Sequence, residues 1–230
     1  MARAAQVREM FGRIVPRYDV VNRLMTGGQD VGWRRVAAQA ARPEGGVALD
    51  IATGTADLAF DLLRLGARRV VAADFCVPML SAAQRKLPVS EPRGIQLMAA
   101  DALALPYADA TFDCVTSGFL LRNVVDLPLC LREMHRVLRP GGRAVSLDLT
   151  PIPAGPLAPL AGFYFHRVVP LLGRLVSGDG AAYRYLPSSL AGFPTADCLT
   201  DLFREVGFGQ VTYRRFGFGA IAIHVATKNE

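Results

Sequence analysis

Two carboxylates and a glycine follow consecutive apolar segments in the first third of the chain. Residues 48–59 read ALDIATGTADLA, in which an apolar strand runs into a turn at Gly54 and then into a segment of helical composition. Glycine adopts the backbone conformation that a tight turn needs, and the N–H groups at a helix start are free to bind polar ligand atoms. The next apolar segment, RRVVAAD, ends in Asp74, which could accept hydrogen bonds from a ribose diol. Together these features predict a site for an adenosyl ligand.

The spacing argues against a dinucleotide-binding oxidoreductase. That fingerprint places three glycines after the first strand, so that a pyrophosphate can approach the backbone. Here residues 52–57 read ATGTAD, with alanine at positions 52 and 56, and Asp57 would oppose a pyrophosphate. S-Adenosylmethionine fits better, because Asp50 and Asp57 can face its sulfonium and ammonium groups. The plainer interpretation is that these two acids only cap or solvate a strand–helix junction.

Apolar strands alternate with helical segments along the chain, which predicts a mainly parallel sheet with helices on both faces. We expect strands at 46–51, 69–74, 95–100, 112–117, 143–149, 209–216 and 219–227. Too few residues join the last two for a crossover helix, so they should form an antiparallel hairpin. This pattern is typical of the seven-stranded, Rossmann-like α/β fold of class I methyltransferases.

Composition limits the number of domains and the partners. A chain of 230 residues suits a single domain with a sizeable core. Its net charge of +6 indicates an anionic partner, for which a membrane surface and a nucleic acid are candidates. No aromatic and basic single-strand motif is present, so we expect no nucleic-acid partner.

Cysteine usage and the amino-terminal residues point to the cytoplasm. The four cysteines include no C-x-x-C pair, which predicts reduced thiols rather than a disulfide framework or a metal site. The first residues are charged and lack the apolar run of a signal peptide, and no uncharged stretch is long enough to span a bilayer. We therefore expect a cytoplasmic protein, with peripheral contact to the inner face of the membrane left open.

Four motifs resemble the ubiquinone/menaquinone biosynthesis C-methyltransferase family, and the match runs nearly end to end. YDVVNRLMTGGQDVGWRR at residues 18–35 is similar to the first family signature, and REMHRVLRPGGR at 132–143 to the second. FLLRNVVD at 119–126 resembles the central motif, and AYRYLPSSLAGFP at 182–194 the tyrosine-rich segment. The resemblance implies methyl transfer from S-adenosylmethionine to a ring carbon of a prenylated quinol.

The resemblance also implies a set of cofactor contacts. Thr55, Asp74, Asp101 and Ala102 match the family's cofactor positions. Asp101 follows the third strand, where it could accept a hydrogen bond from the adenine amino group while Ala102 leaves room for the ring. Asp50 and Gly54 complete the expected set, together with Ser117.

Three positions depart from the family pattern. Asp30 stands where the first signature usually has histidine, which puts any imidazole role there in doubt. Gly118 replaces the serine before F-x-L-R-N, so Ser117, one place earlier, is the candidate for that contact. In LDLT, where the family typically has LEFS, the acid Asp148 is one methylene shorter than glutamate.

Methyl transfer to a ring carbon needs an activated acceptor. The adjacent hydroxyl must lose its proton, because the phenolate moves charge onto its ortho carbon. Arg122 and Asn123 follow the fourth strand, at the edge where ligands bind in such sheets. Arg122 could stabilise the developing oxyanion and Asn123 could orient the ring or a water, while an ion pair between Arg122 and a nearby acid is the plainer alternative.

The catalytic base and the substrate contacts are less defined. The candidate polar contacts come from the amino-terminal signature, from FYFHRVV and from the tyrosine-rich segment: Tyr18, Asp19, Asn22, His166 and Tyr183. A bound water that takes the proton would also suffice.

We expect one methyltransferase domain with two covering segments. Residues 1–42 should form an amino-terminal helical cover, and residues 151–194 an inserted one that faces substrate or membrane. Prolines interrupt residues 151–178, yet 160–176 is apolar with Arg167 and Arg174 set apart on it. This piece could hold an isoprenoid tail and touch anionic lipid, or it could simply pack on the sheet with its arginines in water.

Several functions stay open at this point. Demethylmenaquinol is the preferred acceptor because its ring is larger, but the family serves both pathways and the sequence does not exclude a ubiquinone precursor. Another small-molecule O- or N-methyltransferase would share the same core. A non-catalytic cofactor-binding scaffold of a quinone-synthesis assembly would predict loss of Arg122 and Asn123, which are present. A homo-oligomer is also left open.

Overall fold

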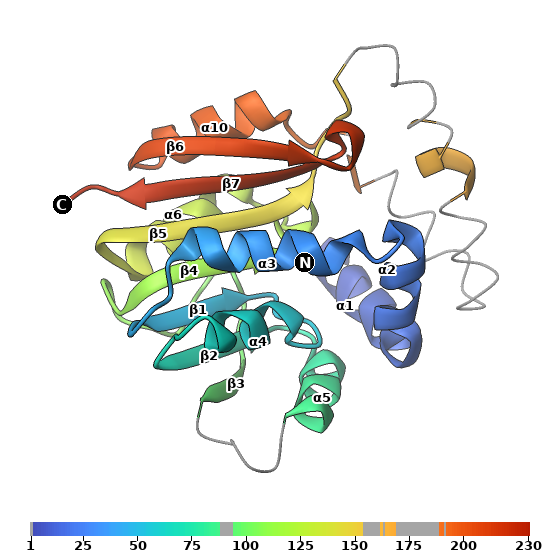
Figure 1. The fold of residues 1–230 in the computed structure, drawn as a ribbon, viewed down its shortest axis with the longest axis horizontal. Helices are drawn as coiled ribbons and strands as arrows, with labels where there is room; N and C mark the ends of the chain where they lie inside the picture. Colours follow the sequence, from blue (N-terminus) through green and yellow to red (C-terminus); the bar gives the residue numbers. More distant parts are fainter. Residues whose placement is uncertain (1, 88–93, 154–161, 163, 169–188, 191) are drawn as a thin grey trace.

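A seven-stranded sheet forms the centre of the computed structural model, which describes residues 2–87, 94–153, 162, 164–168, 189–190 and 192–230 (Figure 1). The strands are β1 (Val47–Ile51), β2 (Arg69–Asp74), β3 (Ile95–Ala99), β4 (Phe112–Gly118), β5 (Leu138–Leu149), β6 (Phe208–Phe216) and β7 (Ile221–Lys228). Their order is β3-β2-β1-β4-β5-β7-β6, in which the first five are parallel and β7 is antiparallel to both neighbours. The predicted parallel set and terminal hairpin are confirmed.

One strand is longer than predicted. β5 begins at Leu138 rather than at residue 143, because Leu138 already pairs with Phe112 of β4. The register shifts between Phe112 and Cys114, so residues 139–142 form an irregular extension. A proline and two glycines there conceal strand pairing from a pattern-based prediction.

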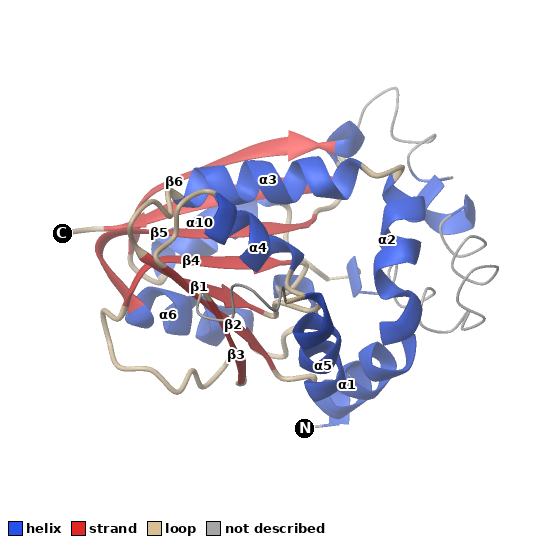
Figure 2. Ribbon diagram, turned by 60° about the horizontal axis from the view of Figure 1, so that its bottom comes forward, coloured by secondary structure: helices blue, strands red, loops and turns tan. Residues whose placement is uncertain are grey.

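Helices cover both faces of the sheet (Figure 2). One face carries α3 (Gln29–Ala41), α4 (Asp57–Arg64) and α5 (Val77–Lys86), and the other carries α6 (Leu127–Val137) and α10 (Ala196–Glu205). The amphipathic helices bury one side each: Leu58 and Leu62 of α4 join the core on the first face, and Leu131 and Met134 of α6 join the core on the opposite face. Two separate cores, one on each face, therefore hold the sheet in place.

The amino-terminal helices form a third, smaller unit. They are α1 (Ala2–Ile14), the short turn η1 (Val15–Arg17) and α2 (Tyr18–Thr26). Met10, Ile14 and Val21 are buried together in a cluster of their own. In Figures 1 and 2, α1 lies beside α5, while α2 stands beyond the ends of the strands and leads back into α3.

Three short helical turns complete the described elements: η2 (Leu121–Asn123), a π-helical turn η3 (Tyr164–Val168), and η4 (Gly217–Gly219) at the tip of the terminal hairpin. Most of the expected inserted cover at 151–194 lies outside the described residues. Within the described part of the chain, no helix has the length and apolar character needed to cross a membrane.

The extension of β5 predicts a sharp contrast between two glycines. A Cβ on Gly142 would lie 2.8 Å from the carbonyl oxygen of Asp113 and 2.9 Å from that of Arg139, both backbone atoms that cannot move aside alone. We expect Gly142→Ala to lower the free energy of unfolding by about 1–3 kcal/mol. Gly32 lies in α3 with no atom within 4 Å of an added Cβ, so Gly32→Ala should raise it by about 0.5–1 kcal/mol. Chemical denaturation of both variants checks this contrast, and equal effects would contradict it.

Candidate active site

A cavity of about 310 Å³ opens at the carboxyl edge of the parallel strands. Ile51, Ala52 and Gly54 line it from the turn after β1, and Asp74 to Cys76 line it from the turn after β2. The segment after β3 adds residues 100–103, and the end of β4 with η2 adds residues 118–120 and 123–125. Phe11 and Tyr18 close it from the amino-terminal unit. This is the edge where ligands bind in open parallel sheets.

The turn after β1 contains more left-handed residues than its one glycine indicates. Gly54 has a φ of 57°, as predicted, but Ala52 and Ala56 also have positive φ values of 54° and 68°. Phe119, across the cavity, has a φ of 61°. Such conformations cost alanine and phenylalanine about 1–2 kcal/mol each, and they collect at functional sites. The sequence prediction missed this, because alanine carries no signal for a left-handed turn.

Asp50 does not line the cavity. Its carboxylate accepts hydrogen bonds from the hydroxyls of Thr53 at 2.6 Å and Thr116 at 2.8 Å, and its side chain is buried beneath the turn. Burial raises the pKa of Asp50 to about 6, although both hydroxyl groups act in the opposite direction. Asp50 therefore holds the glycine turn from below rather than facing the cavity.

Asp74 lies on the cavity wall and ties two turns together. Its Oδ2 accepts a hydrogen bond from the N–H of Gly54 and its Oδ1 one from the N–H of Cys76, both at 2.8 Å. Burial raises the pKa of Asp74, and backbone hydrogen bonds from Cys76, Gly54 and Phe75 counteract part of that effect. A carboxylate accepts about four hydrogen bonds, so acceptor capacity remains for a ligand diol.

Asp101 and Ala102 line the cavity on its other side. Oδ1 of Asp101 accepts a hydrogen bond from the N–H of Leu103 at 2.9 Å, which fixes the carboxylate. Ala102 is buried and presents only a methyl group. This pairing of an acceptor with a flat apolar surface suits a planar ring that bears an amino group.

Two expected cofactor contacts point elsewhere. The Thr55 hydroxyl donates to Oδ1 of Asp19 at 2.7 Å, and Thr55 is not among the cavity residues. Ser117 is buried, and its hydroxyl has no hydrogen-bond partner among the described residues. Gly118 takes its place on the cavity wall, where an added Cβ would meet nothing closer than Leu58 at 3.8 Å.

Arg122 forms a buried ion pair with Asp148 and does not line the cavity. Asp148 also accepts from the backbone N–H of Arg122 at 3.3 Å, so the shorter acid of the LDLT motif fixes both the side chain and the turn. The guanidinium lies 5.4 Å from the ring centre of Phe119, a cavity residue, while its Nε–H has no partner among the described residues. Arg122 thus reaches the cavity through Phe119.

Asn123 lines the cavity with one polar atom unused. Its Nδ2 donates to the carbonyl oxygen of Phe119 at 2.8 Å, which fixes the orientation of the amide. The Oδ1 atom is buried and has no partner among the described residues. A buried acceptor without a partner is costly, so this atom is suited to a ligand donor.

The amino-terminal unit brings Tyr18 into the cavity. The Tyr18 hydroxyl is hydrogen-bonded to Asn22, and burial raises its pKa against the opposing effect of Arg34. Asp19 faces away toward Thr55 and Lys86. The backbone of His166 lies in η3 but its side chain is outside the description, and Tyr183 falls outside the described residues.

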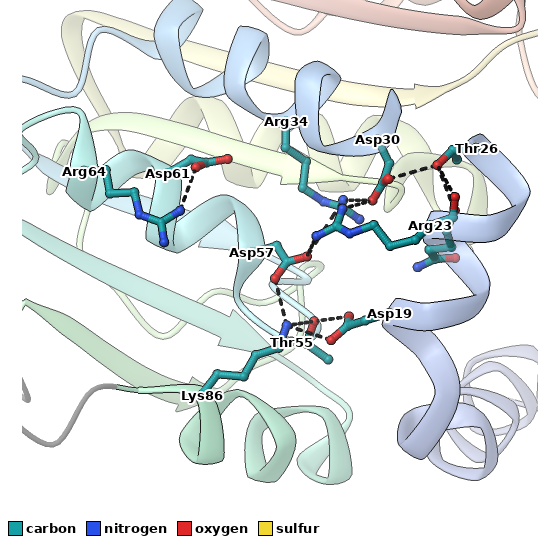
Figure 3. Close-up of polar contacts among 11 residues, drawn as sticks. Asp19, Arg23, Thr26, Asp30, Arg34, Thr55, Asp57, Asp61, Arg64 and Lys86 are labelled. Atoms are coloured by element: carbon teal, nitrogen blue, oxygen red, sulfur yellow. Dashed lines mark hydrogen bonds and ion pairs between the residues drawn. The ribbon is translucent and has the colours of Figure 1, made fainter. Parts of the chain in front are cut away.

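Asp30 forms ion pairs with two arginines. It is buried, pairs with both Arg23 and Arg34, and accepts a hydrogen bond from the Thr26 hydroxyl at 2.9 Å (Figure 3). Nη2 of Arg23 also forms an ion pair with Oδ2 of Asp57 at 3.1 Å. Asp30 therefore makes an ion-paired junction between α2 and α3.

The cavity fits S-adenosylmethionine. Free acceptor positions on Asp74 and Asp101 suit a diol and an amino group. Apolar side chains, including Phe11, Met79 and Leu103, supply most of the remaining wall. The sequence prediction missed Phe11, Met79 and Phe119, because apolar residues at helix and turn positions give no signal of a binding role.

The buried carboxyl of Asp50 predicts a pH effect on stability. Its folded pKa of about 6 lies above the unfolded value near 4, so the folded protein binds the proton more tightly. The stabilisation is present below pH 4 and is lost as the pH rises to 6. The free energy of unfolding of the parent minus that of Asp50→Asn should fall by about 3 kcal/mol over this range. Denaturation at a series of pH values checks it; a flat difference would contradict the shift.

Known proteins of similar sequence extend over almost the whole chain. The ubiE/COQ5 methyltransferase family matches residues 1–228. The ubiquinone/menaquinone biosynthesis C-methyltransferase UbiE of Desulfotalea psychrophila is 45% identical over 230 residues, which cover 99% of this chain and 92% of that protein. The demethylmenaquinone methyltransferase of Thermus thermophilus is 46% identical over 223 residues, or 95% of this chain and 100% of that protein.

Solved structures agree in fold. A SAM-dependent methyltransferase from Thermotoga maritima superposes with a TM-score of 0.68 at 20% identity, covering 97% of this chain and 100% of that one. The cyclase SpnF reaches 0.72 at 17% identity, covering 98% and 97%. At such identities the likeness concerns the fold alone, whereas the sequence matches carry the relationship. This chain belongs to the ubiE/COQ5 methyltransferase family and is an S-adenosylmethionine-dependent methyltransferase.

Proposed function

We propose that this enzyme methylates a ring carbon of a prenylated quinol, with demethylmenaquinol as the preferred acceptor. One observation carries the proposal: Tyr18, from the amino-terminal signature, lines the same cavity as the acid Asp74 of the methyltransferase core. The part of the sequence that resembles quinone methyltransferases therefore bounds the space where an acceptor would meet the cofactor. Relatives named for demethylmenaquinone methylation, 46% and 44% identical over nearly the full chain, favour that acceptor.

The cofactor would be held mainly by two carboxylates. Asp74 accepts from the ribose diol, and Asp101 accepts from the adenine amino group beside Ala102. The turn at Gly54 would contact the methionine end of the cofactor, and Asp50 would hold that turn from beneath through Thr53. Thr55 and Ser117 act indirectly, since neither lines the cavity. When bound, S-adenosylmethionine supplies an electrophilic methyl group on a sulfonium.

The acceptor hydroxyl would be governed by the turn after β4. The free Oδ1 atom of Asn123 accepts its hydrogen bond and orients the ring for in-line attack, which is where proximity contributes most to the rate. Because Arg122 does not line the cavity, its unused Nε–H would reach a developing oxyanion through a bridging water. Because Asp148 offsets the charge of Arg122, this contribution is a directed hydrogen bond rather than a bare positive charge.

An apolar tail on the acceptor would bring the enzyme to the membrane. We infer a cytoplasmic location with peripheral binding to anionic lipid, supported by the net charge of +6. Val20 and Leu24 of α2 are half exposed, and Phe218 at the hairpin tip is 74% exposed. Figure 1 and Figure 2 show α2 and the hairpin tip at the same end of the molecule. A homo-oligomer would be compatible with the same exposed surface.

Two variants should separate the cofactor site from the chemistry. Asp74→Asn removes the charged acceptor on the cavity wall and should weaken S-adenosylhomocysteine binding by at least tenfold, since hydrogen bonds to a charged group are worth about 1.5–3 kcal/mol. Arg122→Lys keeps a positive charge beside Asp148 but removes the Nε–H, so it should lower kcat about tenfold and leave cofactor binding nearly unchanged. Calorimetry and initial rates measure the two effects. Equal loss of cofactor affinity in both variants would contradict this division.

The function itself is tested by methyl transfer from labelled S-adenosylmethionine under reducing conditions. We expect label on the ring carbon of a short-tailed demethylmenaquinol, with a benzoquinol precursor of ubiquinone as the parallel substrate. Label on both rings would indicate activity in both pathways. Intact cofactor binding without label on either would overturn the quinol proposal in favour of another small-molecule acceptor or a scaffold.

A further inference from the structure

The amino-terminal unit of α1, η1 and α2 has a small apolar cluster of its own and contacts the body of the enzyme along α5. Its buried residues, Met10, Ile14 and Val21, form a cluster that merges with neither core on the sheet. Yet it closes the cavity with Phe11 and Tyr18, and Cε1 of Tyr18 would lie 3.9 Å from a Cβ on Gly54. Movement of this unit would therefore uncover the cofactor turn without disturbing either main core.

Two glycines give this unit a hinge. Gly27 and Gly28 join α2 to α3 with φ values of 57° and 77°, and an added Cβ would meet no atom within 4 Å at either position. Both are exposed. Consecutive residues with free space and left-handed conformations absorb dihedral changes at low cost. α3 itself packs on the sheet, so the motion would concern residues 2–26.

Opposite this hinge, a set of charges joins the unit to the body (Figure 3). Nζ of Lys86, at the end of α5, contacts Oδ2 of Asp19 at 2.7 Å and Oδ1 of Asp57 at 2.8 Å. Arg23 of α2 reaches the other oxygen of Asp57 at 3.1 Å. Although burial acts against the ionised form, the hydrogen bond and charge of Lys86 hold the pKa of Asp57 below its usual range. The contacts thus span α2, α4 and α5.

We propose that residues 2–26 are a hinged cover that opens to exchange the cofactor, and that Asp19, Arg23, Asp57 and Lys86 are the latch that holds it closed. Asp30, paired with Arg23 and Arg34, sets the direction of Arg23 on the hinge side. The four latch side chains are 22–38% exposed, so each pair is weak and screened by salt. This inference concerns the cofactor alone and holds whichever acceptor the enzyme methylates.

A weak latch is what cofactor exchange requires. S-Adenosylhomocysteine must leave and S-adenosylmethionine must enter at every turnover, and both would pass the ring of Tyr18, which lines the cavity. A cover held by extensive apolar packing would open too rarely. Partly solvated ion pairs can break and form again without exposing a core.

The test is the rate of cofactor exchange in the full chain. S-Adenosylhomocysteine carries no net charge, so long-range steering contributes little and salt reports mainly on the latch. We expect Lys86→Gln and Asp19→Asn each to raise both kon and koff about three- to tenfold, with a smaller change in Kd. In the parent, kon should rise between 0.05 and about 0.5 M salt because the latch pairs are screened, and Lys86→Gln should remove most of that rise. Stopped-flow fluorescence of Trp33, the single tryptophan, or surface plasmon resonance measures these rates.

A matched control and a second readout complete the experiment. Arg204→Gln removes an equal charge from an exposed ion pair on α10, far from the cover, and should leave both rates unchanged. Hydrogen exchange should become faster in residues 2–26 of Lys86→Gln but not in α6 or α10, which also shows that the variant is folded. A rise in koff alone, with kon and its salt dependence as in the parent, would contradict the proposal that the cover controls entry of the cofactor. Lys86 would then only stabilise the bound state. Unchanged exchange in residues 2–26 would overturn the cover.

Discussion

The carboxylate of Asp74 joins the two turns on which the site depends. One oxygen holds the N–H of Gly54 after β1, and the other holds the N–H of Cys76 after β2. Parallel pairing of β1 with β2 brings the ends of both strands to one edge, and Asp74 fixes the turns relative to each other there. The same group keeps acceptor capacity for a ligand, so the cavity and its binding groups share one interaction. A ligand bound to Asp74 would thereby be coupled to the closure of both turns.

The sequence predicted most of the sheet and the part of the site at strand ends. Apolar runs mark strands because side chains of a central parallel sheet are buried on both faces, and the short 217–219 connection allows only a hairpin. Asp74 and Asp101 follow such runs, so their position at the carboxyl edge comes from strand length alone. The extension of β5 was missed because Pro140, Gly141 and Gly142 resemble a turn although residues 138–142 still pair with or flank β4.

The sequence did not predict the direction in which the side chains of Asp50, Asp57 and Arg122 point. Residue type and spacing place Asp50, Asp57 and Arg122 near the carboxyl edge, but partners elsewhere in the chain decide which way they point. Thr116, 66 positions away, holds Asp50 inward, and Asp148, 26 positions away, holds Arg122. Charged and hydroxyl groups find these partners because an unpaired buried polar group is costly. The left-handed conformations of Ala52 and Ala56 could not be predicted either, because the fold and not the residue type imposes them.

Asp30, at the position where the resemblance to the family's first signature implies histidine, links α2, α3 and α4. A neutral imidazole has one acceptor nitrogen, so it could accept a hydrogen bond from only one of the neighbouring guanidinium groups. A buried carboxylate instead binds Arg23 and Arg34 together. Both arginines then approach Asp57, so the charges on α2, α3 and α4 become one network. Such a network can orient residues 2–26 on the body of the enzyme. It contributes only a small free energy to closure, because its exposed side chains remain in contact with water. These ion pairs thereby add a salt-sensitive contact to the apolar one that Phe11 and Tyr18 make at the cavity.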